Sequence, residues 1–160
     1  RRPPSSTLFP YTTLFRSAPI LFARSIAGGT PINVFNNGDM ARDFTYIDDI
    51  VDGVMRVIDR PPRENPSWNA AISDPAGSKA PYKIYNIGLG APVSLLDFIH
   101  ALEERLGKKA VKNFMPMQPG DVQATYADVS DLAREVGYTP STTLESGLDR
   151  FVSWFRDYYV

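Results

Sequence analysis

One arginine, Arg42, lies in a stretch of sequence crowded with carboxylates. The segment NNGDMARDFTYIDDIVDGV, residues 36–54, places it between a turn and the expected start of a helix, beside Asp39, Asp43, Asp48, Asp49 and Asp52. If one of these aspartates neutralises Arg42, the arginine contributes only ordinary surface electrostatics. If the fold directs it elsewhere, its planar guanidinium can bind an anion through two parallel hydrogen bonds. The sequence leaves both interpretations open.

A second loop, MQPGD at residues 117–121, ends in an acid and is suited to the recognition of hydroxyl groups. Each feature taken alone has a plainer explanation, because Arg42 can pair with Asp43 or Asp39 and Pro119-Gly120 is typical of a turn. Taken together, the arginine and the acidic loop indicate a binding role for the chain.

The residues that commonly perform catalysis give little support for it. Asp48 and Asp49 could act as general acid and base, but at a helix start their usual role is to stabilise the helix dipole. His100 is the only histidine, and beside Ile99 on an expected helix it is interpreted as a partly exposed structural residue. No glycine-rich loop joins an expected strand to a helix, so the sequence predicts no phosphate cradle.

Composition limits the possible classes of protein. The 160 residues suit one domain or a piece of a larger protein, and 43% hydrophobic with 22% charged residues is ordinary for a globular chain. A net charge of -1 argues against a nucleic-acid or membrane-surface partner. The chain has no cysteine, and no apolar run approaches the roughly 20 residues of a membrane helix. We therefore expect a cytoplasmic protein without a cysteine- or histidine-rich metal site.

The elements that must position these residues mix helices with short strands. Apolar spacing predicts helices at 18–29, from Ile47 to a stop at Pro61, from Ser94 to Gly107, at 128–137 and from about Leu144. Short strands are expected at 31–35, 82–88 and 110–116, and residues 62–81 are expected to form a surface loop. The pattern predicts a small mixed α/β domain. Because its strands are short, the domain is expected to pack on something else.

The helix from Ile47 has the clearest pattern. Thr45 is expected to cap it, and its apolar residues recur at spacings of three and four: Ile47, Ile50, Val51, Val54, Met55 and Ile58. Similar apolar faces run from Leu95 to Leu106 and from Leu144 to Phe155. We expect part of the apolar surface of these faces to be exposed to water, because the partner domain that would cover it is expected to be missing.

The first segment, RRPPSSTLFPYTTLFRS at residues 1–17, does not match the rest. It has no helical or alternating period, and it resembles translated read-through of a sequencing adapter. It is interpreted as an unstructured, artefactual segment, with the natural sequence beginning near Ala18. The remaining residues, 18–160, are expected to form one domain.

Four segments in order carry a family resemblance: INVFNNGDMARDFTYIDDIVDGVMRVID, YNIG, NFMPMQPGDVQATYADVSDLAREVGYTP and GLDRFVSWFRDYY. They resemble the C-terminal part of the extended short-chain dehydrogenase/reductases, the NAD-dependent epimerase/dehydratase family. The UDP-sugar 4-epimerases, and among them those that act on UDP-glucuronate, are the most similar branch. The resemblance covers about residues 18–160 and implies a UDP-sugar-binding domain that lies beside a Rossmann domain.

The resemblance implies roles for five residues. Val34 and Phe35 match the strand end whose backbone meets the uracil ring, and Arg42 matches the arginine that holds the UDP phosphates. Asp121 matches the acid that binds the ribose hydroxyls. Galactose-type epimerases have a second phosphate arginine just before that acid, whereas here Met117 and Gln118 occupy the region, so Gln118 is the remaining candidate for that contact.

The family's chemistry requires residues that this chain lacks. The resemblance implies NAD on an N-terminal Rossmann domain and a catalytic Tyr-x-x-x-Lys pair, but none of the eight tyrosines has a lysine four positions later. We therefore expect an inactive fragment that binds UDP-sugar, lacks its Rossmann half and binds no NAD; family enzymes are usually homodimers. The alternatives are a UDP-sugar decarboxylase or dehydratase of the same superfamily and a non-catalytic nucleotide-binding module.

Overall fold

A computed structural model describes residues 18–159, which divide into two compact units. Unit 1 comprises residues 18–39, 96–121 and 148–159, and unit 2 comprises Met40–Leu95 and Val122–Gly147. Residues 1–17, interpreted above as foreign to the fold, lie outside the described part of the chain. None of the described helices is long and apolar enough to cross a membrane.

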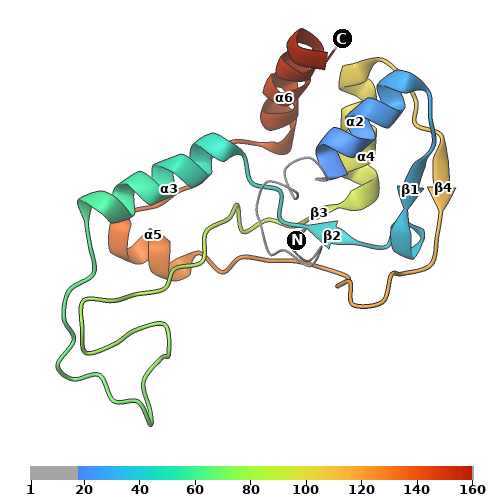
Figure 1. Ribbon diagram of the computed structural model, residues 1–160. Coiled ribbons are helices and arrows are strands. Elements are labelled where there is room, and N and C mark those ends of the chain that lie inside the picture. Colours follow the sequence, from blue (N-terminus) through green and yellow to red (C-terminus); the bar gives the residue numbers. More distant parts are fainter. Residues whose placement is uncertain (1–17, 160) are drawn as a thin grey trace, which may run out of the picture. The chain divides into compact units, whose positions relative to one another are not determined.

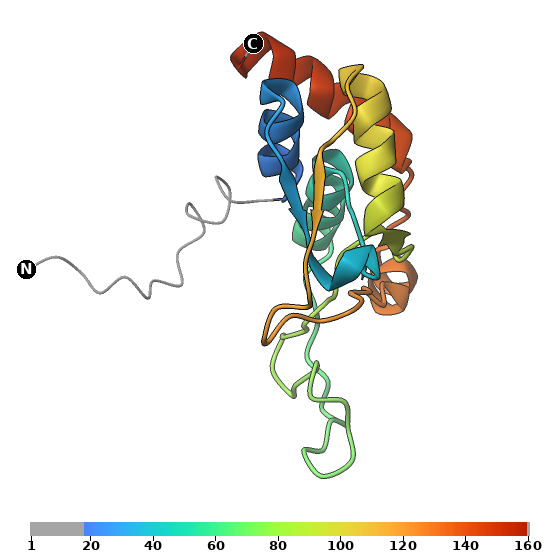
Figure 2. The same cartoon turned by 90° about the vertical axis from the view of Figure 1, so that its right-hand side faces the viewer.

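Unit 1 combines a pair of parallel strands with helices (Figures 1 and 2). Strand β1, Ile32–Val34, pairs in parallel with β4, Lys112–Phe114, and the register sets Val34 opposite Phe114. Helix α2, Ala18–Gly28, and most of α4, Leu95–Leu106, and α6, Leu144–Tyr159, complete the unit. Its core consists of Phe22, Ala23, Ile26, Ile32, Val34, Phe98, Ile99, Leu102, Leu148, Val152 and Phe155.

Unit 2 is built around a small second core. Strand β2, Ala41–Arg42, pairs antiparallel with β3, Val93–Ser94, and helices α3, Ile47–Asp59, and α5, Ser130–Val136, belong to the same unit. α5 ends at Gly137, whose φ of 72° is left-handed. The buried residues Leu132, Val136 and Tyr138 form this core, and four partly buried side chains pack against it: Val57, Tyr85, Ile87 and Val129.

Gly53, in the middle of α3, allows this core to close against the helix. A Cβ atom on Gly53 would lie 2.4 Å from Ile87 Cδ1 and 3.1 Å from the ring of Tyr138. Tyr138 is 1% exposed and donates a hydrogen bond of 2.9 Å to the carbonyl of Gly88. The YNIG segment is therefore held between α3 and Tyr138.

Two expectations about local structure are wrong. Residues 82–88 are not a strand: their one ladder contact is an isolated bridge between Lys83 and Gly77. The segment is held by a backbone bond from the Ile84 N–H to the Ala76 carbonyl at 2.7 Å and by side chains such as Tyr138, whose hydroxyl donates to the Gly88 carbonyl. Thr45 does not cap α3, because the N-cap residue is Tyr46 and the Thr45 hydroxyl accepts the Leu89 N–H at 3.0 Å.

The expected surface loop at 62–81 is confirmed, and Lys83 ties its far end to α5. The Lys83 ammonium lies 2.7 Å from Asp131 and 3.8 Å from both Glu135 and Asp74. Its hydrogen bond to Asp131 raises the pKa of Lys83, against the opposing effect of its burial. This ion cluster fixes the end of the loop on the second core.

The apolar face of α3 is exposed in unit 2, whereas the faces of α4 and α6 are used in unit 1. Phe98, Ile99 and Leu102 of α4 are buried. On α3, five apolar side chains between Ile47 and Ile58 are 49–64% exposed: Ile47, Val51, Val54, Met55 and Ile58. The expectation of uncovered apolar surface is therefore confirmed for α3 alone, and the other two helices cover the core of their own unit. These five exposed side chains form an apolar stripe on α3, and exposed apolar surface of this kind favours association between protein molecules.

Replacing Met55 and Ile58 together by lysine should reduce self-association without lowering the melting temperature, because these side chains are 51% and 64% exposed. Sedimentation velocity and thermal unfolding measure the two effects. Val57→Lys is the matched control on the same helix, since Val57 packs against the second core. It should destabilise the chain by roughly 2 kcal/mol or more. Equal destabilisation by both changes would show that the stripe is covered.

Candidate substrate-binding site

Arg42 lies on β2 and its guanidinium is held by backbone carbonyls. Nη1 donates to the Ala41 carbonyl at 2.8 Å and to the Gln123 carbonyl at 3.1 Å. The strand itself is fixed on both sides, since Ala41 N–H donates to Gln123 at 2.9 Å and β2 pairs with β3. Arg42 is thus a half-buried cation whose guanidinium is held by the carbonyl of its neighbour Ala41 and by that of Gln123 from a distant segment.

Three of the five neighbouring aspartates have other partners. Asp52 pairs with Arg56 at 2.6 Å. Asp49 is 7% exposed and accepts the backbone N–H groups of Ser141 and Thr142, at 3.2 and 3.1 Å. Asp49 therefore holds a distant loop, in addition to any effect on the helix dipole expected from its sequence position.

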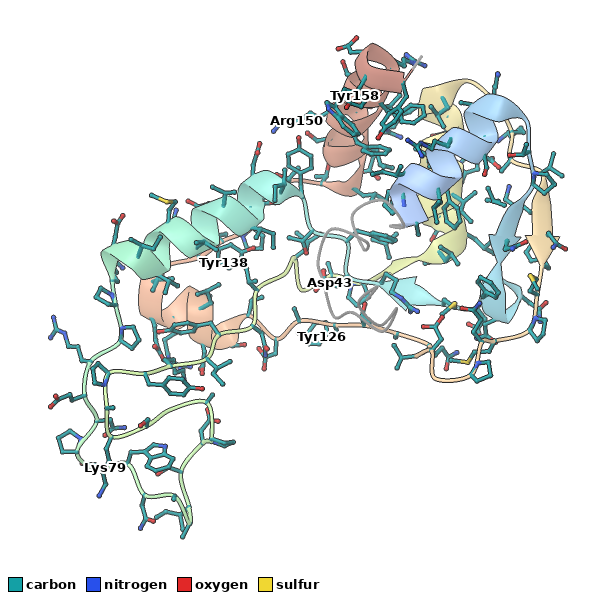
Figure 3. All side chains as sticks on the ribbon, viewed as in Figure 1. Asp43, Lys79, Tyr126, Tyr138, Arg150 and Tyr158 are labelled. Atoms are coloured by element: carbon teal, nitrogen blue, oxygen red, sulfur yellow. The ribbon has the colours of Figure 1, made fainter. Side chains whose placement is uncertain are left out.

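Asp43, the third, joins three segments of unit 2. Its Oδ2 accepts the backbone N–H of Gly90 at 3.0 Å and of Ala127 at 3.1 Å, and its own N–H donates to the Thr125 hydroxyl at 3.2 Å. Figure 3 shows Asp43 beside the segment that carries Tyr126. The residue directly after Arg42 is therefore a cross-link between segments far apart in the sequence.

These carboxylates affect the buried tyrosine nearby. Burial raises the pKa of Tyr138, and the negative charges of Asp49, Asp52 and Asp43 raise it further. Tyr138 consequently stays a neutral hydrogen-bond donor to Gly88 at physiological pH. The acidic stretch around Arg42 thus has a structural role in unit 2.

In unit 1, Val34 and Phe35 lie where β1 meets a turn. Val34 is fully buried, and its carbonyl accepts the Met115 N–H at 3.0 Å. Its side chain therefore packs in the core of unit 1, and its carbonyl is bonded to the residue that follows β4. Phe35 is half-buried and begins a 3-10 turn, Phe35–Gly38, that contains Asn36 and Asn37 at φ 49° and 51°. Asparagine tolerates this left-handed conformation. The strand end expected from the sequence is present, and Phe35 is the less buried of its two residues.

Gln118 and Asp121 share one turn in the same unit. The Asp121 N–H donates to the Gln118 carbonyl at 3.1 Å, and Gly120 takes a φ of 82° inside the turn. Gln118 is exposed and Asp121 is half-buried. Unit 1 therefore contains Val34, Phe35, Gln118 and Asp121, and brings the last two together, whereas Arg42 belongs to unit 2.

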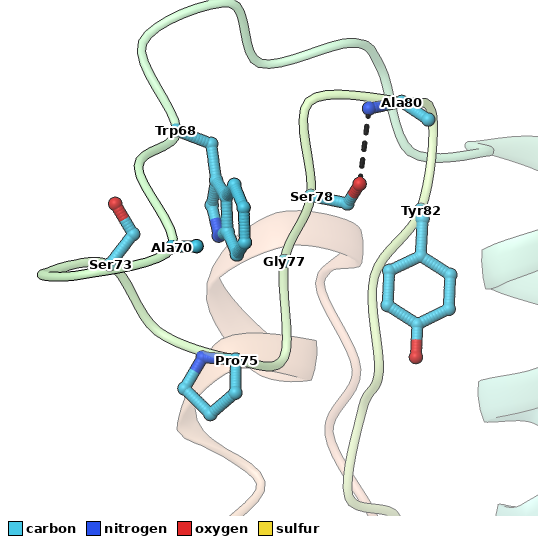
Figure 4. A pocket seen from close by; sticks show the side chains of 8 residues that line it. All are labelled: Trp68, Ala70, Ser73, Pro75, Gly77, Ser78, Ala80 and Tyr82. Carbon is cyan, nitrogen blue, oxygen red and sulfur yellow. Dashed lines mark hydrogen bonds between the residues drawn. The ribbon is translucent and has the colours of Figure 1, made fainter.

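A hollow of about 690 Å³ lies elsewhere in unit 2, within the loop after α3 (Figure 4). Trp68 packs beside Gly77, and its indole N–H donates to the Asp74 carbonyl at 3.0 Å. No charged side chain lines it: the lining residues are Trp68, Ala70, Ser73, Pro75, Gly77, Ser78, Ala80 and Tyr82. This chemistry does not suit a diphosphate, and none of the residues expected to bind substrate takes part.

The described residues offer little for metal or acid–base chemistry. Among them, no cluster of three or more histidine, cysteine or acidic side chains could hold a metal ion. His100 is 61% exposed on α4 and lies 3.6 Å from Glu104, as expected for a structural histidine.

Sequence reasoning missed the long-range hydrogen bonds of Arg42 and Asp43. The bonds from Asp43 to Ala127 and Thr125 join positions more than 80 residues apart. Gly88 makes another contact with a distant segment, since a Cβ there would lie 2.5 Å from the Ala127 side chain. The glycine of YNIG was a visible signal, but its partners could not be inferred from the sequence.

Solved structures with this fold belong to sugar-nucleotide enzymes. A UDP-glucuronic acid 4-epimerase from Bacillus cereus, in complex with UDP-glucuronic acid and NAD, matches 91% of this chain with a TM-score of 0.73 and 28% identity. The match covers 41% of that enzyme. A UDP-glucose 4-epimerase from Thermotoga maritima has the same fold, with a TM-score of 0.68 at 23% identity. The fold is that of the C-terminal part of a Rossmann-type epimerase or dehydratase.

The family model of the GDP-mannose 4,6 dehydratases matches residues 7–151, and the chain belongs to this family of short-chain dehydrogenase/reductase epimerases and dehydratases. Protein CapI of Staphylococcus aureus is 48% identical over 138 residues. A probable UDP-glucuronate 4-epimerase of Rhizobium meliloti is 39% identical over 139 residues. This chain spans 41% of the length of each of these two relatives. The family resemblance seen in the sequence is confirmed.

Proposed function

We propose that the chain is the UDP-binding part of an NAD-dependent UDP-sugar 4-epimerase that interconverts UDP-glucuronate and UDP-galacturonate. The position of Arg42 carries the proposal, because its half-buried guanidinium is held by two backbone carbonyls. The chain is also similar to an epimerase solved with UDP-glucuronic acid. Relatives from bacteria and plants whose names include UDP-glucuronate 4-epimerase support this substrate.

Each predicted contact then has a role in its own unit. Arg42 binds the diphosphate through a charge-assisted hydrogen bond. Phe35 meets the uracil ring, Val34 supports it from the core, and Asp121 accepts hydrogen bonds from the ribose hydroxyls. Gln118 is an uncharged phosphate contact, in the region where galactose-type enzymes have an arginine.

The described residues do not fit NAD. A dinucleotide pyrophosphate needs a glycine-rich turn between a strand and a helix. Here β1 leads into the turn Phe35–Gly38 and on to β2, and β3 runs directly into α4. NAD is present in similar solved enzymes, and we assign its binding in the complete protein to an N-terminal Rossmann half. A homodimer and a cytoplasmic location remain expectations for that complete protein.

Two other functions remain as alternatives. One is a UDP-sugar dehydratase or decarboxylase of the same family, and the family description, which names a dehydratase, supports the first of these. A non-catalytic nucleotide-binding module is the other alternative. Titration of the chain with UDP, GDP and dTDP tests the preference for uridine that the epimerase shares with its UDP-sugar alternatives, because Phe35 and Asp121 are expected to select the nucleoside.

The purified chain should bind UDP but neither bind NAD nor interconvert UDP-sugars, because the residues for both belong outside it. NMR-detected titration with UDP and NAD, and chromatography of UDP-glucuronate after incubation, measure these properties. Epimerisation by this polypeptide alone would refute the assignment as a fragment. Absence of any UDP effect on the spectrum would refute the assignment as the UDP-binding part.

A further inference from the structure

We propose that Asp43 is a positioning residue for Arg42: its carboxylate fixes the strand from which Arg42 reaches the diphosphate. The inference rests on the proposed function and goes beyond it, because Asp43 touches no substrate in this role. It assigns specificity for the phosphates to a pair of neighbouring residues of opposite charge.

The carboxylate of Asp43 connects two segments that flank β2. Oδ2 accepts the N–H of Gly90, which lies shortly before β3, and the N–H of Ala127, on the segment after Gln123. The Asp43 N–H also donates to the Thr125 hydroxyl at 3.2 Å. The residue after Arg42 is thus bonded to both neighbours of its strand.

The segment held by Asp43 is the one that holds Arg42. Gln123 accepts the Arg42 Nη1 bond at 3.1 Å and the Ala41 N–H bond at 2.9 Å, and Thr125 N–H donates to the Ala41 carbonyl at 3.2 Å. Because the Asp43 carboxylate accepts the Ala127 N–H of this segment, its loss should loosen the carbonyls that orient the guanidinium.

The geometry around Asp43 leaves little room for another side chain. A Cβ on Gly88 would lie 2.9 Å from Asp43 Oδ2, so the glycine at position 88 leaves the space that this carboxylate occupies. Oδ1 is buried and accepts no hydrogen bond from the described residues. An asparagine in the same rotamer therefore places its NH₂ group either in that buried position or against two N–H donors, and both arrangements are unfavourable.

Amide hydrogen exchange of the full 160-residue chain tests the first step without any ligand. Asp43→Asn and Asp43→Ala should speed exchange at Gly90 and Ala127, and also at Ala41 and Thr125, by roughly tenfold or more, the scale of one lost hydrogen bond to a charged group. The matched control is Asp49→Asn, which removes another acceptor of two backbone N–H groups. It should speed exchange at Ser141 and Thr142 only.

Binding of UDP and uridine to the same variants, followed by NMR, tests the second step. Asp43→Asn should weaken UDP about tenfold while uridine is unchanged, and it should add nothing in an Arg42→Ala background. Asp49→Asn should leave the binding of both UDP and uridine unchanged. Equal losses for UDP and uridine, or fast exchange at Gly90 and Ala127 with Ala41 and Thr125 unaffected, would overturn the inference.

The two proposals can fail separately. If the wild-type chain does not respond to UDP but Ala41 and Thr125 exchange faster in Asp43→Asn, the proposed function fails while the link between Asp43 and the Arg42 strand stands. If Arg42→Ala weakens UDP and Asp43→Asn does not, the proposed function stands and the positioning role is wrong.

Discussion

Replacing Glu103 by glutamine is expected to lower the free energy of unfolding by about 3 kcal/mol at neutral pH. Glu103 is 2% exposed on α4 and is bonded to Lys109 at 3.0 Å, to Lys112, and to the Ala110 N–H at 3.0 Å. Burial alone would raise its pKa, but the hydrogen bonds from Lys112, Ala110 and Lys109 outweigh it and lower the pKa from 4.5 to about 2. Glutamine keeps the shape and leaves the lysines without their anion.

The pH dependence gives the effect a distinct signature. Because the folded pKa of Glu103 is depressed, its contribution is complete above the unfolded value of 4.5 and is lost as pH falls toward about 2. Urea unfolding of wild type and Glu103→Gln should therefore differ most at pH 7 and converge near pH 2. Glu104→Gln is the control, since Glu104 is 58% exposed. A difference independent of pH would contradict this account.

Arg42→Ala is expected to weaken UDP binding by ~1.5–3 kcal/mol, the cost of losing a hydrogen bond to a charged group. The measurement is calorimetry on this chain joined to the N-terminal half of a related epimerase, where the substrate site is complete. Uridine has no phosphates and should bind as before. Arg56→Ala removes an arginine that pairs with Asp52 and should leave both ligands unaffected. Equal losses for UDP and uridine would make Arg42 a structural residue.

Periodic elements were predictable from the sequence. Apolar residues spaced by three and four located α3, α4 and α6, and glycine ended α4 and α5 at Gly107 and Gly137. The segment 82–88 shows the limit of this reasoning. Its composition suits a strand, but Tyr82 and Ile84 are 49% and 53% exposed, and among the described residues its ladder contact is one isolated bridge. Strand composition cannot supply a pairing partner.

Charged residues were harder to interpret, because their roles depend on segments distant in sequence. Nothing in LEERLGKK distinguishes buried Glu103 from exposed Glu104, and the difference comes from the chain reversal at Gly107 that returns Lys109 and Lys112. Asp49 was interpreted through its helix position, yet its partners are more than 90 residues away. The roles of Val34, Phe35, Gln118 and Asp121 in binding remain predictions.

Gly53 illustrates a conflict for protein engineering. Helix propensity alone recommends Gly53→Ala, with a gain of about 1 kcal/mol in a helix interior. The added methyl group would lie 2.4 Å from Ile87 Cδ1 and 3.1 Å from the Tyr138 ring, so the change that improves the isolated helix requires Ile87 and Tyr138 to shift in the second core. Consensus or library designs on this chain should therefore keep glycine at this position and seek their gains on solvent-exposed parts of α3.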